Sequence, residues 1–215
     1  KILQFAKEGE TREGIYEKLI IQDIQDACDL FLPIYQESNR KDGYVSLEVN
    51  PYLAYNTRGT VQEAEKLFRL TNRPNVMIKV PATKEGLSAV EGLIGQDIHV
   101  NITLVFSQKQ YIQSAETYLS AIEKAYLNGK DISRIHSVVS VFISRVDNAF
   151  DLLLDKKANE TDSEMQRSQF SYLKGKAAVA NARMIYRNYR NLFDFNFVKG
   201  MEKSGANIQR VLWAS

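Results

Sequence analysis

Apolar residues follow two different spacings along this chain, one typical of strands and one typical of amphipathic helices. Five apolar segments are too short for helices and are bounded by turn residues, so they are predicted to be strands. They are Tyr44–Val49, Val76–Val80, His99–Phe106, Ser137–Ile143 and Val211–Ala214. Apolar residues recur at helical spacing between them. The helices are expected over about residues 11–37, 61–70, 84–94, 108–127, 146–154 and 172–192, with a short helical piece around 197–202.

Short polar residues mark where several of these helices begin. Thr60, Thr83 and Ser107 are predicted N-caps, because a hydroxyl can accept a hydrogen bond from the first free backbone N–H groups. Residues 156–167 are polar and lack periodicity, which indicates a solvated loop or an exposed turn of helix.

Strands and helices alternate along the whole chain, which predicts a parallel sheet with crossover helices. The chain has no linker rich in Pro, Gly or Ser and no internal repeat. We therefore expect residues 1–215 to form a single α/β domain. The stretch between the fourth and fifth strands is long enough for two helices.

Polar residues interrupt the strands on what is predicted to be one face of the sheet. They are Glu48, Lys79, Asn101, Thr103 and Ser140. A parallel sheet covered by helices is normally apolar on both faces. Four strands with polar residues on the same face are therefore harder to explain by chance than one such strand. In a closed barrel these side chains would converge inside, near the C-terminal ends of the strands, where active sites lie.

Lys79 lies inside the apolar segment Val76–Val80. Burial disfavours the charged ammonium and favours the free amine that attacks carbonyl carbons, so an imine with a ketone is the predicted chemistry. A carboxylate such as Glu48 can transfer protons directly or through a water held by Thr103. The alternatives are a Lys79 whose ammonium reaches solvent at a strand edge and a Glu48 that only forms a structural ion pair.

Structural roles are also open for the other polar residues. Asn101 and Thr103 share a face and can form a hydrogen-bonded core pair. Ser140 and Arg145, near a helix start, suit a phosphate group. Arg145 can instead form a surface ion pair with a carboxylate such as Asp147 or Asp151.

Composition indicates which kinds of protein and which binding partners the chain does not suit. Apolar residues make up 44% and charged residues 25% of the 215 residues, which is typical of globular proteins, and the net charge of +2 gives no indication of nucleic acid or membrane binding. The single cysteine, Cys28, excludes an internal disulfide, suits a cytoplasmic compartment and is expected in the core. No apolar run approaches a membrane span. Because the first residues are charged, we expect no signal peptide. His99 and His136 precede strands and are expected at the far rim of the sheet. No residues have metal-ligand spacing.

Five segments resemble the transaldolase family. Residues 76–87 are similar to its Schiff-base lysine signature, 45–49 to its glutamate strand, and 101–107 to its Asn-Thr strand. Residues 140–147 resemble its phosphate-binding strand end, and 210–215 the start of its seventh strand. The resemblance extends over nearly the whole chain.

The resemblance implies a (β/α)8 TIM barrel and a cytoplasmic enzyme of the pentose phosphate pathway. It implies transfer of a dihydroxyacetone unit from sedoheptulose 7-phosphate or fructose 6-phosphate to an aldose phosphate, with no metal or organic cofactor. By position, Lys79 would form the imine, while Glu48 and Thr103 would move protons through a water.

The same comparison implies that Asn101 contacts the sugar and that Ser140 and Arg145 hold the phosphate. The family's first two strands, with their aspartate and Thr-Ser-Asn-Pro motif, and its last strand have no counterpart here. We therefore expect the chain to be part of a longer protein and to have little or no activity alone. A class I aldolase-like lyase and an inactive fragment with a binding or assembly role remain the alternatives. The sequence does not indicate an oligomeric state.

Overall fold

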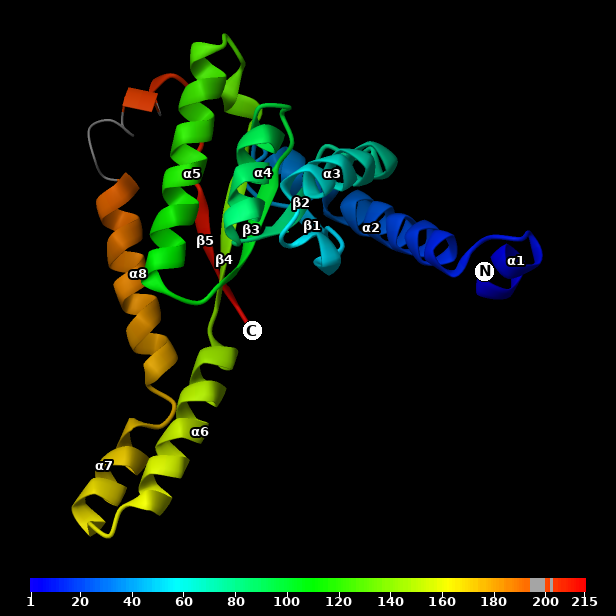
Figure 1. Cartoon of the computed structure of the whole chain (residues 1–215). Helices are drawn as coiled ribbons and strands as arrows, with labels where there is room; N and C mark the ends of the chain where they lie inside the picture. Colours follow the sequence, from blue (N-terminus) through cyan, green and yellow to red (C-terminus); the bar gives the residue numbers. More distant parts are fainter. Residues whose placement is uncertain (194–199, 202) are drawn as a thin grey trace.

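The computed structural model describes residues 1–193, 200–201 and 203–215. Within this part of the chain, five parallel strands form one sheet in the order β1-β2-β3-β4-β5 (Figure 1). The strands are β1 (Val45–Glu48), β2 (Val76–Pro81), β3 (Val100–Val105), β4 (Ser137–Phe142) and β5 (Arg210–Ala214). Each strand neighbours the next one in the chain, as in a TIM barrel, so the predicted fold class and strands are confirmed.

Helices connect the strands and cover one face of the sheet. They are α1 (Ile2–Lys7), α2 (Arg12–Glu37), α3 (Thr57–Thr71), α4 (Lys84–Ile94), α5 (Gln108–Leu127), α6 (Ser144–Glu160), α7 (Glu164–Leu173) and α8 (Ala177–Phe193), with 3-10 turns η1 (Pro51–Leu53) and η2 (Ile132–Arg134). Helices α3, α4, α5 and α8 pack against one another in sequence, whereas α6 and α7 project as a hairpin (Figure 1). None of the described helices is both long and apolar enough to cross a membrane.

Two of the predicted caps are confirmed and one is wrong. Thr83 accepts from the backbone N–H of Gly86, and Ser107 accepts from that of Gln110. The cap of α3 is Asn56 rather than Thr60, since its side chain accepts from Gly59. Thr60 lies inside α3, where its buried hydroxyl donates to the carbonyl of Leu53.

The segment between β4 and β5 is more helical than predicted. Only residues 161–163 of the expected loop separate α6 from α7. The expected helix over 172–192 is also interrupted, because Gly175 adopts a positive φ of 68° between α7 and α8. The described part of this stretch thus contains the three helices α6, α7 and α8, where two helices and a short helical piece were predicted. The helical piece expected around 197–202 lies largely outside the described residues.

Apolar side chains from the helices and from the outer face of the sheet form the core. Cys28 is fully buried there, as predicted, and burial raises the pKa of its thiol to about 11. Such a thiol is protonated near neutral pH, which suits a packing role.

The two histidines lie directly before β3 and β4, at the far end of the sheet as predicted, and both are buried there. The rings of Tyr44, His99 and His136 contact one another with centroid distances of 5.3 to 5.8 Å. Nearby, Arg210 at the start of β5 donates to Asp42, which precedes β1, over 2.8 Å. The first and last strands of the sheet therefore approach each other at this end, as the curvature of an incomplete barrel requires.

Candidate active site

The strand register places three of the predicted site residues at one level of the sheet. Glu48 pairs with Lys79 across β1 and β2, and Lys79 pairs with Asn101 across β2 and β3. Residues paired in this way project from the same face, so the predicted gathering of polar side chains is observed.

Lys79 and Glu48 form an ion pair, with Nζ 3.1 Å from Oε2. Their side chains are 26% and 45% exposed, although the other residues of β2 are buried. The side chain of Lys79 is therefore partly exposed, between the two predicted alternatives of a buried lysine and one whose ammonium reaches solvent. An exposed ion pair contributes little to folding, so this geometry is more informative about proton transfer than about stability.

The turn after β2 holds the lysine strand against the loop that follows β1. Thr83 receives a hydrogen bond from Gly86 over 2.9 Å and donates one to the carbonyl of Ala54. Gly86 packs so tightly that a Cβ atom there would lie 2.0 Å from the carbonyl oxygen of Pro81. The bond from Thr83 to Ala54 thus joins the turn after the lysine strand to the segment that follows the glutamate strand.

The amide of Asn101 bonds to two serines and not to Thr103. Its Nδ2 donates to Ser46 Oγ over 3.0 Å, and its Oδ1 accepts from Ser140 Oγ over 2.8 Å. The predicted Asn–Thr core pair is therefore not formed. Our sequence reasoning missed Ser46, although it lies two residues before Glu48 on the same strand face.

Thr103 is fully buried, and its hydroxyl has no hydrogen-bond partner among the described residues. It lies beside an irregularity of β3, where the register with β4 shifts between Ile102 and Val105. Leu104 adopts a φ of 60°, which is rare for a residue with a side chain. An unpaired buried hydroxyl beside a bulge is typical of a position that binds water or ligand.

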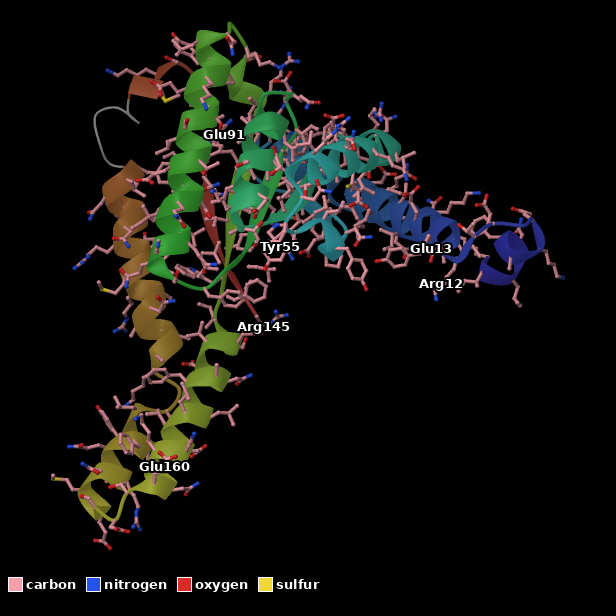
Figure 2. All side chains as sticks on the ribbon, viewed as in Figure 1. Arg12, Glu13, Tyr55, Glu91, Arg145 and Glu160 are labelled. Carbon is pink, nitrogen blue, oxygen red and sulfur yellow. The ribbon has the colours of Figure 1, made fainter. Side chains whose placement is uncertain are left out.

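Arg145 lies in the first turn of α6, directly after β4 (Figure 2). Its exposed guanidinium stacks on the ring of Phe142, with 4.8 Å from Cζ to the ring centroid. The ring of Phe106 also stacks on that of Phe142, with 5.3 Å between the two centroids. The predicted alternative partners are engaged elsewhere. Asp147 accepts from the backbone of Ala178, and Asp151 from that of Gly175.

Arg145 forms no ion pair within the described residues, and no hydrogen bond there links it to Ser140. The two predicted phosphate ligands are thus not joined to each other. Ser140 is instead bonded to Asn101.

A groove of about 720 Å³ opens beside Glu48, between α2 and β1. Its lining includes apolar residues such as Ile20 and Val49 and the exposed ring of Tyr52. A larger hollow of about 820 Å³ lies at the opposite end of the sheet, around Arg40 and His99, away from these groups. Within the described ranges, no three His, Cys, Asp or Glu side chains are grouped to hold a metal ion.

The whole chain, residues 1–215, matches the family model described as "Transaldolase/Fructose-6-phosphate aldolase". A transaldolase of Trichodesmium erythraeum (strain IMS101) is 42% identical over 201 residues, which cover 94% of this chain and 53% of the relative. "Transaldolase 2" of Streptomyces coelicolor (strain ATCC BAA-471 / A3(2) / M145) is 43% identical over 215 residues, which cover 100% of this chain and 56% of the relative. A transaldolase of Mycobacterium tuberculosis (strain ATCC 25618 / H37Rv) is 39% identical over 216 residues, with the same coverage. The chain thus spans about half the length of these relatives.

Proposed function

The chain belongs to the transaldolase/fructose-6-phosphate aldolase family, and on this premise we propose that the protein containing it is a transaldolase. It transfers a dihydroxyacetone unit from a ketose phosphate, sedoheptulose 7-phosphate or fructose 6-phosphate, to an aldose phosphate. We place this activity in the cytoplasm, in the pentose phosphate pathway. The observation that supports the proposal most strongly is the 3.1 Å separation of Lys79 Nζ from Glu48 Oε2.

Imine formation begins with the release of a proton from Lys79. Glu48 is close enough to accept this proton directly. The free amine then adds to the ketone carbon of the donor, and the resulting carbinolamine loses water to form a protonated imine. Glu48 can return a proton to the departing hydroxyl group, so one carboxylate performs both transfers.

Cleavage and transfer follow from the electron demand of the imine. As the hydroxyl at the β-carbon loses its proton, the bond between the α- and β-carbons breaks and its electron pair moves toward the imine. An aldose phosphate leaves, and an enamine remains on Lys79. The enamine attacks the aldehyde carbon of the acceptor, and hydrolysis of the new imine releases the product ketose and the amine. A water held by the buried hydroxyl of Thr103 suits these proton transfers.

Asn101 would contact a hydroxyl of the sugar, while Ser140 and Arg145 would hold its phosphate. The exposed guanidinium of Arg145 is kept in place by the ring of Phe142, next to the backbone N–H groups that begin α6. A guanidinium and helix N-terminal N–H groups both favour an anion. This part of the proposal is therefore supported more strongly for Arg145 than for Ser140.

Reduction with borohydride tests the imine. With fructose 6-phosphate, we expect a covalent adduct on Lys79, located by mass spectrometry of the peptide that contains it. Lys79→Arg keeps the positive charge beside Glu48 but cannot form the adduct. Lys84→Arg, five residues away in the exposed first turn of α4, is the matched control and should be labelled like the wild type. An unlabelled Lys79 in the wild-type protein would refute the proposal.

A second candidate function is that of an aldolase, because the name of the matching family includes fructose-6-phosphate aldolase. An aldolase releases the three-carbon ketone without an acceptor, whereas a transaldolase holds it on the lysine until an acceptor arrives. We expect product formation from fructose 6-phosphate to depend on an added aldose phosphate. Steady release of dihydroxyacetone in its absence would favour the aldolase.

A further inference from the structure

Serine hydroxyls from two other strands hold the amide of Asn101. Ser46 on β1 accepts from its Nδ2 atom, and Ser140 on β4 donates to its Oδ1 atom. The hydrogen bonds thus form a row from β1 through β3 to β4, at 3.0 and 2.8 Å. Rotation of the amide away from this row would break both bonds, so the row fixes the plane of the amide.

The amide keeps hydrogen-bonding capacity for a ligand. A primary amide has two N–H donors and two acceptor positions on its oxygen, and each serine uses one of them. Asn101 pairs in register with Lys79 and is only 3% exposed. One donor and one acceptor of this amide therefore have no hydrogen-bond partner among the described residues.

The two serines differ in burial among the described residues. Ser140 is buried, whereas Ser46 is exposed. The bond from Asn101 on β3 reaches Ser46 across the lysine strand β2, so it holds the amide over that strand.

We propose that Ser46 is a positioning residue for the transfer reaction. It holds the amide of Asn101 so that the remaining N–H meets a hydroxyl of the donor sugar next to the imine on Lys79. Ser46 touches no reacting atom and acts only through Asn101. This inference rests on the proposed function, since it requires a ketose phosphate bound at Lys79.

A double-mutant cycle tests the inference, with borohydride trapping of Lys79 at increasing fructose 6-phosphate as the readout. Ser46→Ala should raise the concentration for half-maximal trapping about fivefold, the effect of one lost hydrogen bond. Ser46→Thr keeps the hydroxyl on an exposed strand position that tolerates a β-branched residue, and should match the wild type. In the Asn101→Ala background, Ser46→Ala should have no further effect.

Each outcome separates the inference from the function on which it rests. Absence of trapping in the wild type refutes the proposed function. Normal trapping in the wild type with an unchanged Ser46→Ala variant refutes the positioning role alone. A Ser46→Ala effect that persists in the Asn101→Ala background, or that Ser46→Thr shares, also refutes it. Thermal unfolding of each variant distinguishes a lost positioning role from a general loss of structure. An effect of Ser46→Ala that came from a general loss of structure would persist in the Asn101→Ala background.

Discussion

Thr103 combines complete burial with a hydroxyl that lacks a partner among the described residues. Replacement by valine removes the hydroxyl and keeps the shape. Because a buried unpaired polar group destabilises the folded state, Thr103→Val should leave the free energy of unfolding unchanged or raise it by about 1 kcal/mol. Donor cleavage should nevertheless slow by about tenfold or more if the hydroxyl holds the water used in proton transfer. Urea denaturation and single-turnover kinetics measure the two effects.

Thr71 provides the matched control. It is the last residue of α3, it is fully buried, and its hydroxyl likewise has no described partner. Thr71→Val should therefore change stability as Thr103→Val does, without slowing cleavage. Equal cleavage rates in both variants would remove Thr103 from the proposed proton path.

Single residues show how much of the site the sequence could predict. The polar residues and their strands can be read from the sequence, and their common face follows from the period of two along each strand, which is a local property. The exposure of Lys79 and the bond from Ser46 to Asn101 depend on which strands lie beside one another. Ser46 was missed because one serine in an alternating strand is indistinguishable from an ordinary solvent-facing residue.

The junction between β2 and α4 is the element on which the position of Lys79 depends. A Cβ atom on Gly86 would lie 2.0 Å from the carbonyl oxygen of Pro81. Gly86→Ala should therefore lower the free energy of unfolding by about 1–3 kcal/mol, as overpacking of a rigid backbone does. It should also reduce Lys79 labelling, because the turn joins the lysine strand to the segment that follows the glutamate strand. Urea denaturation and borohydride trapping check this prediction.

Gly92 in the same helix is the comparison, since an added Cβ would meet only a side-chain atom of Val61 at 3.7 Å. Gly92→Ala should raise the free energy of unfolding by about 0.5–1 kcal/mol, because alanine favours the helix. If the two alanine variants changed stability in the same direction, tight packing at Gly86 would not be the cause.

The α6–α7 hairpin shows where prediction of elements failed. A helix was predicted over residues 146–154, but residues 156–167 lack apolar periodicity and were expected to be a solvated loop or an exposed turn of helix. Its helices are joined by polar contacts that are distant in sequence, such as the ion pair of Lys174 with Asp155 and the hydrogen bond from Gly175 to Asp151. A local pattern of residues cannot reveal such pairs. The helices with an apolar face, α4 and α5, were predicted to within a residue.

For the molecule as a whole, strand order was predictable and curvature was not. Regular alternation of strands and helices favours sequential parallel neighbours. Nothing local indicates that Asp42 meets Arg210 or that Tyr44, His99 and His136 pack together. These contacts bring the first and last strands together at the far rim of the sheet and bury the two histidines that were predicted to lie there.

The buried histidines make the stability of the whole fold depend on pH. Burial lowers the pKa of His99 from 6.5 to about 4. Burial, together with the adjacent His99, lowers that of His136 from 6.5 to about 4. As pH falls below 6.5, the unfolded chain binds protons at these positions that the folded chain does not bind until pH is near 4. The free energy of unfolding should therefore decrease from pH 6.5 to 4 and show no histidine contribution above pH 7.

One histidine with this shift accounts for about 3 kcal/mol across that range. Carboxylates also titrate there, so urea denaturation across the range must compare the wild type with His136→Phe. Phenylalanine preserves an aromatic ring against Tyr44 and His99 and cannot bind a proton. The variant should lose less stability between pH 6.5 and 4 than the wild type does. Identical pH dependence in both proteins would mean that the pKa of His136 is the same in the folded and unfolded states. Burial of His136 would then contribute nothing to the acid sensitivity of the fold.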